Sequence, residues 1–292
     1  MSTATATDAA AAGRARREAS RRLWRLVVYA MLVVGSLVYA FPLLLMLRTS
    51  LTPVGMLMAD PPVLFPWPPY WENYVILWEE VPIPRWLANS TQITVISVLA
   101  ETITSTLVAF GFARTHFRGR DKLFYGVLAT MMLPTTVTLV PQFILYQSLG
   151  WINTFWPLIV PRFFGTAFYI FILRQFFLAL PRELDDAAEI DGANRLQILL
   201  RIVVPLSGPA IATVAVFSFM NRWNDFLEPV IYLFTPENLT LAVGLRWFTG
   251  RHGTEFHLLM AGALLMTAPM IVAFFLAQKH FVRGIALTGI KG

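Results

Sequence analysis

The stretch PRELDDAAEIDGANRLQILLRIVVPLSGP, residues 181–209, decides the fold prediction because it is polar where the flanking sequence is apolar. Pro181 suits the first turn of a helix, and the acidic residues that follow suit the positive end of the helix dipole. Gly192 can adopt the left-handed conformation that ends a helix. Leucines at helical spacing follow Gly192 and indicate a second helix. The stretch therefore predicts a helix–turn–helix that projects from an apolar environment.

The composition of the whole chain indicates a polytopic helical membrane protein. Of its 292 residues, 57% are hydrophobic and only 14% are charged, whereas about 25% of the residues of ordinary soluble domains are charged. The chain contains no cysteine, which excludes disulfides, thiolate metal sites and thiol nucleophiles. The fold class is therefore predicted to be all-α and embedded in a membrane.

The apolar runs divide the chain into a tail and a membrane domain. Residues 1–25 form a basic tail, which we expect in the cytoplasm, and residues 26–292 form the transmembrane domain, with a cytoplasmic loop at about 181–205. Six runs are long and apolar enough to predict transmembrane helices: 26–47, 90–113, 123–146, 152–177, about 203–220, and 258–281.

The positions of the basic residues predict the topology of these spans. If the N-terminus is cytoplasmic, the inner segments carry 17 Lys and Arg residues and the outer segments carry 5. Cytoplasmic loops carry the excess of positive charge in membrane proteins. Both termini are therefore expected in the cytoplasm, together with the acidic stretch. The Pro- and Trp-rich outer segment, residues 48–89, is expected to lie along the outer interface.

The acidic stretch resembles the EAA loop of ATP-binding-cassette (ABC) importer permeases. The consensus of that loop is E-A-A, three residues, G, nine residues, then I-x-L-P. The matching residues here are Asp186, Ala187, Ala188, Gly192, Ile202, Val204 and Pro205. The spacing is intact, although Asp replaces Glu at the first position and Val replaces Leu near the end. The resemblance is to binding-protein-dependent transport system inner membrane components.

Three further strings are similar to the carbohydrate-uptake branch, in particular to the smaller permease of the maltose-importer type. They are FSFMNRWNDFLEPVIYL at 217–233, LTLAVGL at 239–245 and VRGIALTGIKG at 282–292. The resemblance implies the type I ABC importer permease architecture and import of a sugar or oligosaccharide. It also implies a second permease, two ABC ATPase subunits and an extracytoplasmic solute-binding protein as partners. Importers of glycerol-3-phosphate or another polyol share much of this pattern and remain an alternative.

In the resembled family, the EAA helix docks in a cleft on the ATPase. The resemblance assigns this docking role to Asp186, Ala187, Ala188 and Gly192, with Glu183 and Asp191 as contacts at the rim. The chain lacks the phosphate-binding string G-x-x-x-x-G-K-[ST] that ATP hydrolysis needs. We therefore expect a non-catalytic subunit that binds no cofactor, with ATP and magnesium held by the partner ATPase subunits.

Some polar residues in or near the spans are candidates for other roles. Glu101 lies near the centre of the second run, where an ionisable group is costly. It is expected either to line the solute pathway or to bond Ser and Thr hydroxyls on a neighbouring helix. Arg162 is expected to be an anchor near the outer interface. Four residues after the fifth run are candidates for solute contacts or for a helix-end cap: Asn221, Trp223, Asn224 and Asp225.

Other classes of function find less support in the residues. An ion-coupled secondary transporter needs paired intramembrane charges and usually an internal repeat, whereas Glu101 stands nearly alone. A membrane enzyme needs a clustered nucleophile, base or metal set, and the four histidines are scattered without metal-ligand spacing. A structural subunit without a solute pathway stays open. The resemblance places the protein in a bacterial or archaeal cytoplasmic (inner) membrane, without nucleic acid as a partner.

Overall fold

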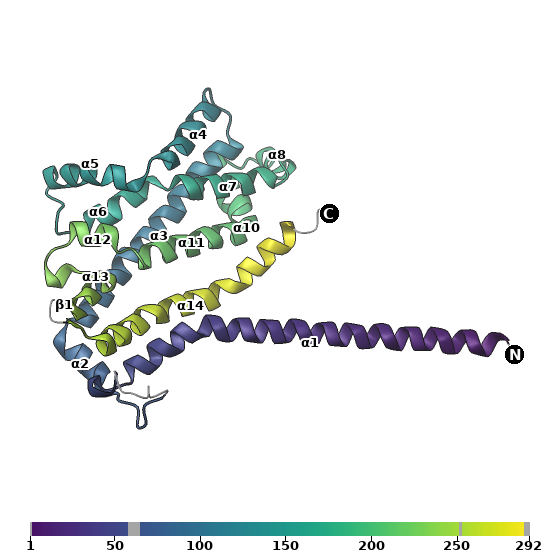
Figure 1. Ribbon diagram of the computed structural model, residues 1–292. Helices are drawn as coiled ribbons and strands as arrows, with labels where there is room; N and C mark the ends of the chain where they lie inside the picture. The colour runs from purple at the N-terminus through teal and green to yellow at the C-terminus, as the bar shows by residue number, and fades with distance from the viewer. Residues whose placement is uncertain (1, 58–64, 251–252, 289–292) are drawn as a thin grey trace.

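The computed structural model describes residues 2–57, 65–250 and 253–288. These residues form an almost entirely helical protein with one two-stranded hairpin (Figure 1). His252 and the last four residues of the C-terminal string lie outside the described residues. The all-α prediction is confirmed.

The first half of the described chain contains a long N-terminal helix, a long central helix and several shorter helices between them. In order these are α1 (Ser2–Ser50), η1 (Val54–Met56), α2 (Glu72–Glu80), α3 (Ile83–Arg114), α4 (Arg120–Ala129), η2 (Thr130–Met132), α5 (Thr135–Ser148), α6 (Trp156–Ile159), η3 (Val160–Phe164) and α7 (Ala167–Ala179).

The second half begins with the acidic stretch and ends with a long helix. In order its elements are α8 (Glu183–Ile190), α9 (Arg195–Ile198), the π-helical turn η4 (Leu199–Val203), α10 (Val204–Leu206), α11 (Gly208–Trp223), α12 (Leu227–Tyr232), η5 (Pro236–Asn238), α13 (Leu241–Gly244), η6 (Leu245–Phe248), β1 (Thr249–Gly250), β2 (Gly253–Thr254) and α14 (Phe256–Thr288).

Among the residues that the structure describes, four helical segments are long and apolar enough to cross a membrane, or up to six if each of two bent pairs is one span. The four are 20–50, 83–114, 156–179 and 256–276, which correspond to the first, second, fourth and sixth predicted runs. The bent pairs are 120–132 with 135–148, and 195–206 with 208–223, with bends of 97° and 82°. They correspond to the third and fifth runs.

Proline and its neighbours explain the bends. Leu133 is extended because it precedes Pro134, and proline disfavours a helical conformation in the preceding residue. In the second pair the break falls at Ser207, between α10 and α11. Pro205 lies in α10, before this bend, and the 16-residue helix α11 begins at Gly208.

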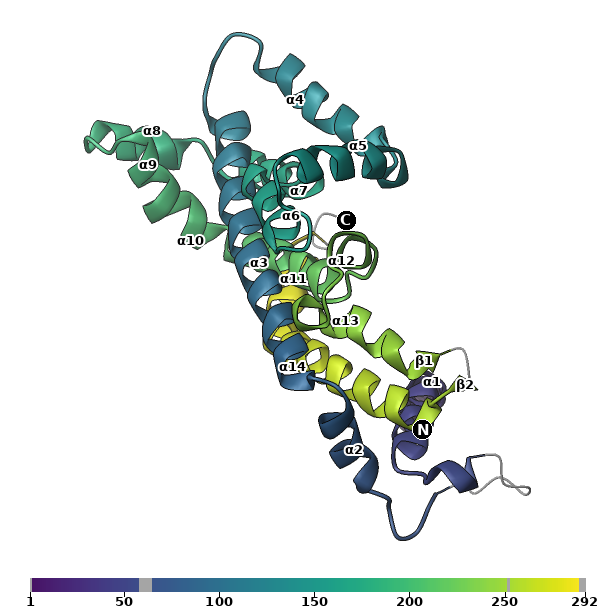
Figure 2. The ribbon, with the colours of Figure 1, turned by 90° about the vertical axis from the view of Figure 1, so that its left-hand side faces the viewer.

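The central helix α3 packs against α7, α11 and the short helices of the second half, while α1 packs against α14 (Figures 1 and 2). In Figure 1 the start of α1, the end of α14 and α8 all lie to the right of α2 and β1. These three segments therefore lie on the same side of α2 and β1, as the predicted topology requires.

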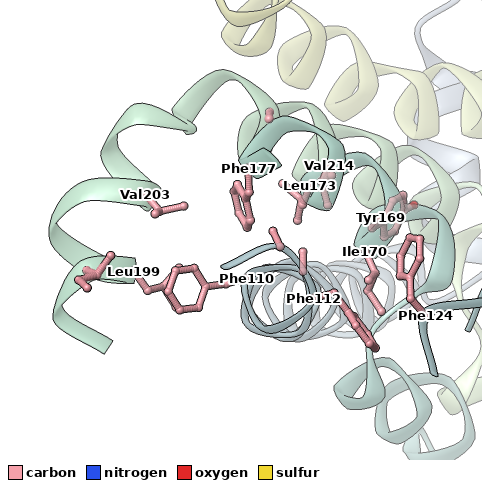
Figure 3. Packing of buried hydrophobic residues seen from close by; sticks show 14 residues of the cluster. Phe110, Phe112, Phe124, Tyr169, Ile170, Leu173, Phe177, Leu199, Val203 and Val214 are labelled. Carbon is pink, nitrogen blue, oxygen red and sulfur yellow. The ribbon is translucent and has the colours of Figure 1, made fainter. Parts of the chain in front are cut away.

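A hydrophobic cluster joins α3 and α7 to the acidic stretch (Figure 3). Its labelled members are Phe110, Phe112, Phe124, Tyr169, Ile170, Leu173, Phe177, Leu199, Val203 and Val214. Leu199 and Val203 come from the π-helical turn that follows α9. The stretch is thus more than a solvated loop, because its second half is buried against the central helix.

A second cluster lies at the other end of α3, where α2, α13 and α14 meet it. Trp86 is buried at its centre, and its indole Nε1 donates a hydrogen bond to the carbonyl oxygen of Pro236 at 2.7 Å. A Cβ atom added to Gly244 would lie 2.2 Å from the Trp86 ring, so α13 approaches α3 at a distance that only glycine permits.

Candidate functional site

The predicted helix–turn–helix is confirmed, and we call residues 181–206 the arm. Gly192 has φ +81° and ends α8, with its amide donating to the carbonyl oxygen of Glu189 at 3.0 Å. Asn194 then caps α9. Its side chain accepts from the Gln197 amide at 2.9 Å, and the Gln197 side chain accepts from the Asn194 amide at 2.8 Å. This reciprocal capping box fixes the start of the second helix.

The arm exposes most of the residues predicted to dock the ATPase. Five are exposed in this chain: Glu183, Asp186, Ala187, Asp191 and Gly192. Ala188 differs, because it is half-buried and packs against the hydrophobic cluster of α3 and α7. Its small size therefore serves the packing of the arm on its own chain, whereas the exposed five are available to a partner.

The arm also exposes an apolar residue that was not among the predicted docking residues. The side chain of Ile190, at the end of α8, is 86% exposed, and Leu184 in the first turn is 40% exposed. Single exposed apolar side chains are common on protein surfaces, so the relevance of Ile190 lies in its position beside the predicted docking residues Ala187 and Asp191. The sequence signal that could have identified Ile190 is an isoleucine among acidic and alanine residues in a short helix.

One acidic residue of the arm turns inward. Asp185 is buried, and its carboxylate accepts a hydrogen bond from Nη1 of Arg114, the last residue of α3, at 3.1 Å. The other terminal nitrogen of Arg114 donates to the carbonyl oxygen of Leu180 at 2.9 Å. No local sequence pattern marks this pair, since Arg114 and Asp185 lie 71 positions apart in the chain.

Glu101 lies in a buried polar cluster midway along α3. Its carboxylate accepts hydrogen bonds from the Ser218 hydroxyl at 2.5 Å and from the Thr166 hydroxyl at 3.3 Å. The residue is only 2% exposed. Of the two alternatives predicted for Glu101, bonding to hydroxyls of neighbouring helices is confirmed.

The prediction that Arg162 is an anchor at the outer interface was wrong. Its guanidinium forms an ion pair with Glu228 at the start of α12 and lies 3.8 Å from the Glu101 carboxylate. Arg222 pairs with Asp225 at 3.2 Å and lies 3.6 Å from Glu228. Two arginines and three carboxylates thus form one network that holds α12 against α3 and η3.

Asp225 follows the end of α11 within this network. Burial raises the pKa of its carboxyl group and the Glu228 carboxylate adds to the rise, whereas Arg222 lowers it. The backbone amide of Glu228 also donates to Asp225 at 3.3 Å. The contacts of Asp225 with Arg222 and with the Glu228 amide therefore position the start of α12.

Of the other three residues predicted to contact solute, one is buried in the chain and two are exposed. Trp223 is buried, its indole nitrogen donates to the carbonyl oxygen of Met266 at 2.8 Å, and its ring stacks on Phe219. Asn221 and Asn224 remain exposed, although both have partners in the chain. Asn221 donates to the Tyr169 hydroxyl at 2.9 Å, and Asn224 donates to the Met220 carbonyl oxygen at 2.9 Å and to the Met270 sulfur at 3.7 Å.

A groove of about 460 Å³ lies between α3, α6 and η5 and was missed by the sequence analysis. Aromatic and amide side chains line it, including Gln92, Phe155, Trp156, Phe163 and Asn238. Its residues come from distant parts of the chain, so no local motif marks it. Within the part of the chain that the structure describes, no group of three or more His, Asp and Glu side chains is arranged to hold a metal ion.

Comparison with protein families matches residues 102–287 to the model of the binding-protein-dependent transport system inner membrane component. The arabinooligosaccharides transport system permease protein AraQ of Bacillus subtilis is 31% identical over 278 residues, which cover 92% of this chain and 97% of that protein. The maltodextrin transport system permease protein MdxG of the same organism is 31% identical over 284 residues, covering 94% and 98% of the two chains.

Solved structures show the same fold. A chain in the crystal structure of a bacterial ABC transporter involved in the import of the acidic polysaccharide alginate superposes with a TM-score of 0.79 at 22% identity, covering 90% of this chain and 98% of that one. A second match is the bacterial alginate ABC transporter in complex with an alginate pentasaccharide-bound periplasmic protein. Its TM-score is 0.63 at 18% identity, with coverages of 88% and 93%. The type I permease fold expected from the EAA resemblance is therefore confirmed.

Proposed function

The chain belongs to the family of binding-protein-dependent transport system inner membrane components, and from this premise we propose that it is a non-catalytic permease subunit of an ATP-driven importer of a sugar or oligosaccharide. It forms the solute pathway with a second permease in a bacterial or archaeal inner membrane. An extracytoplasmic binding protein delivers the solute, and two ATPase subunits hold ATP and magnesium.

The observation that carries this proposal is the exposed arm. It keeps the spacing of the EAA loop and presents acidic, small and apolar side chains to solvent beyond the apolar helices. A partner changes a conformational equilibrium only through its different affinity for the two states. A full reversal of such an equilibrium takes about 5.5 kcal/mol. An arm whose helices are capped and whose second half packs against α3 can transmit this free energy better than an unstructured linker.

Two features support a saccharide as the solute. The relatives AraQ and MdxG are named as transport permeases for arabinooligosaccharides and for maltodextrin. The exposed amides of Asn221 and Asn224 offer hydrogen-bonding groups, and the groove beside Trp156 combines aromatic faces with amides. Binding sites for small molecules combine apolar walls with a few polar groups that fix orientation.

Reconstitution of the whole importer tests the proposal. The chain, its candidate permease partner, ATPase and binding protein would be purified together and placed in proteoliposomes. We expect ATP-dependent, vanadate-sensitive uptake of a sugar or oligosaccharide, measured with labelled solutes that include glycerol-3-phosphate as the alternative. Uptake driven by an ion gradient without ATP, or failure of the chain to co-purify with an ATPase, would contradict the proposal.

A further inference from the structure

The arm is joined to the membrane helices by two breaks in helical structure. At its start, Leu180 is extended (ψ 142°) between the end of α7 and Pro181. At its end, Ser207 separates α10 from α11, and the two segments are bent by 82°. Neither connection is a continuous helix. A displacement of the arm therefore reaches the spans through side contacts more than through the connecting backbone.

The most directional of these side contacts is the pair of Arg114 and Asp185. The two side chains are 2% and 9% exposed, and their charged atoms lie 3.1 Å apart. Arg114 also holds the Leu180 carbonyl at the start of the arm. A buried charge-assisted pair is orientation-dependent and little screened by solvent, so it fixes the position of α8 relative to the end of α3.

Apolar contacts support this pair on the same side of α3. Phe110 lies one helical turn before Arg114, so the two residues share a face of the helix. Phe110 belongs to the same buried cluster as Leu199 and Val203 of the arm, and Figure 3 shows its ring directed toward Leu199. Both halves of the arm thus contact the end of α3: α8 through Asp185, and the π-helical turn through Leu199 and Val203.

The other end of this connection is the Glu101 cluster. Glu101 and Arg114 lie on one uninterrupted helix, separated by about 20 Å at 1.5 Å per residue. Glu101 is bonded to Ser218 on α11 and to Thr166 before α7, and it lies near Arg162. Movement of α3 would therefore be shared with the neighbouring spans and with the network that holds α12.

We propose that Arg114 and Asp185 are positioning residues that transmit displacement of the arm to α3, and that α3 carries it to the polar cluster around Glu101. This inference rests on the proposed function, because it assumes that a partner ATPase moves the arm. It assigns a role in energy coupling to an acidic residue that faces away from the partner.

Two substitutions in the reconstituted importer test this assignment. Asp185→Asn keeps the size of the side chain and removes its charge. Arg114→Lys keeps the charge but cannot hold Asp185 and Leu180 together with a planar guanidinium. For both variants we expect an assembled complex that hydrolyses ATP, with solute imported per ATP hydrolysed reduced about tenfold or more, as loss of a buried charge-assisted contact implies.

Asp121→Asn is the matched control, because it makes the same chemical change at a 62% exposed aspartate in the first turn of α4. It should leave import per ATP unchanged. Normal import per ATP in assembled Asp185→Asn and Arg114→Lys complexes would overturn the inference, and so would an equal loss in the Asp121→Asn control. If Asp185→Asn does not assemble, Arg114→Lys decides the question alone.

A label on the outer part of α3 supplies a readout that a purely structural role would not change. Thr91→Cys places a single thiol at an exposed position of this cysteine-free chain. Its labelling rate should change on ATP binding in the otherwise unaltered complex and should not change with Asp185→Asn. A change in both complexes, or in neither, would overturn the inference. Failure of the proposed function is distinct, because the unaltered complex would then show no ATP-dependent import.

Discussion

At the scale of single residues, Glu101 shows how the protein stabilises a charge inside an apolar bundle. Its carboxylate has hydroxyl partners from two other segments and a guanidinium nearby. Buried charged groups are costly unless they are paired and hydrogen-bonded. The residue is therefore a point where α3, α11 and the start of α7 are joined.

Glu101→Leu is expected to destabilise the protein by about 1–3 kcal/mol, because the buried hydroxyls that now donate to the carboxylate would lose their acceptor. Thermal unfolding in detergent would measure the loss. Glu79→Gln, at an exposed position of α2, should change stability by less than about 0.5 kcal/mol. An unchanged unfolding temperature for Glu101→Leu would show that the cluster contributes little to stability.

Gly192 supports a second prediction at this scale. A side chain would meet nothing within 4 Å, so the cost of a substitution comes only from its φ of +81°. Val at this position should cost about 1–2 kcal/mol and distort the turn, whereas Asn tolerates the left-handed region. We expect Gly192→Asn to retain more ATPase co-purification and uptake than Gly192→Val. Equal retention by both variants would argue against a requirement for this turn.

At the scale of elements, the local signals of the arm were sufficient to predict its form. Gly192 ends α8 as predicted, and the leucines at helical spacing after it marked the second helix. Pro181, predicted in the first turn, lies just before the Arg182 N-cap of α8 instead. These signals act over a few residues, which is the range at which helix starts and ends are encoded. The bends were harder to predict, because the third and fifth apolar runs are uniform in composition. Proline in such a run is compatible with either a kinked span or two separate helices.

The contacts between elements could not be predicted from local pattern. Asp185 finds Arg114 across 71 positions, and Arg162 finds Glu228 across 66. Nothing in the neighbourhood of either arginine distinguishes it from a topology-setting charge. For the same reason, the resemblance alone could not show that Ala188 packs against its own chain, whereas the packed structure does.

The close approach of α13 to α3 gives a prediction for elements. Gly244→Ala should destabilise the protein by about 1–3 kcal/mol, because the added methyl overlaps the buried Trp86 ring. Gly35→Ala in α1 is the matched control, since nothing lies within 4 Å of the added atom and alanine favours a helix. Unfolding in detergent should separate the two variants, and equal stability would contradict the close packing.

At the scale of the whole molecule, the described chain is a bundle around α3 with one arm and one outlying helix. The apolar segment of α1, residues 20–50, has none of its hydrophobic window buried within the chain, and its packing is with α14. The predicted topology places the arm and both ends of the chain on the same side of the membrane.

Single thiols in the cysteine-free chain test this topology. In a strain without the partner ATPase, a thiol at Ile190 should react with a membrane-impermeant reagent in inside-out vesicles and not in sealed cells whose outer barrier is permeable. A thiol at Trp67, which is 87% exposed in the outer segment, should show the opposite pattern. Reaction of Ile190→Cys from the outer face would reverse the topology and remove the basis for ATPase docking.

The exposed Ile190 side chain also has a consequence for the subunit before it is assembled. A newly inserted copy would present this isoleucine to water until a partner covers it, and exposed apolar surface of this kind promotes aggregation and degradation. Orphan copies would then be removed by proteases while assembled ones persist. The cellular abundance of the chain would in this way depend on the amount of partner ATPase in the cell.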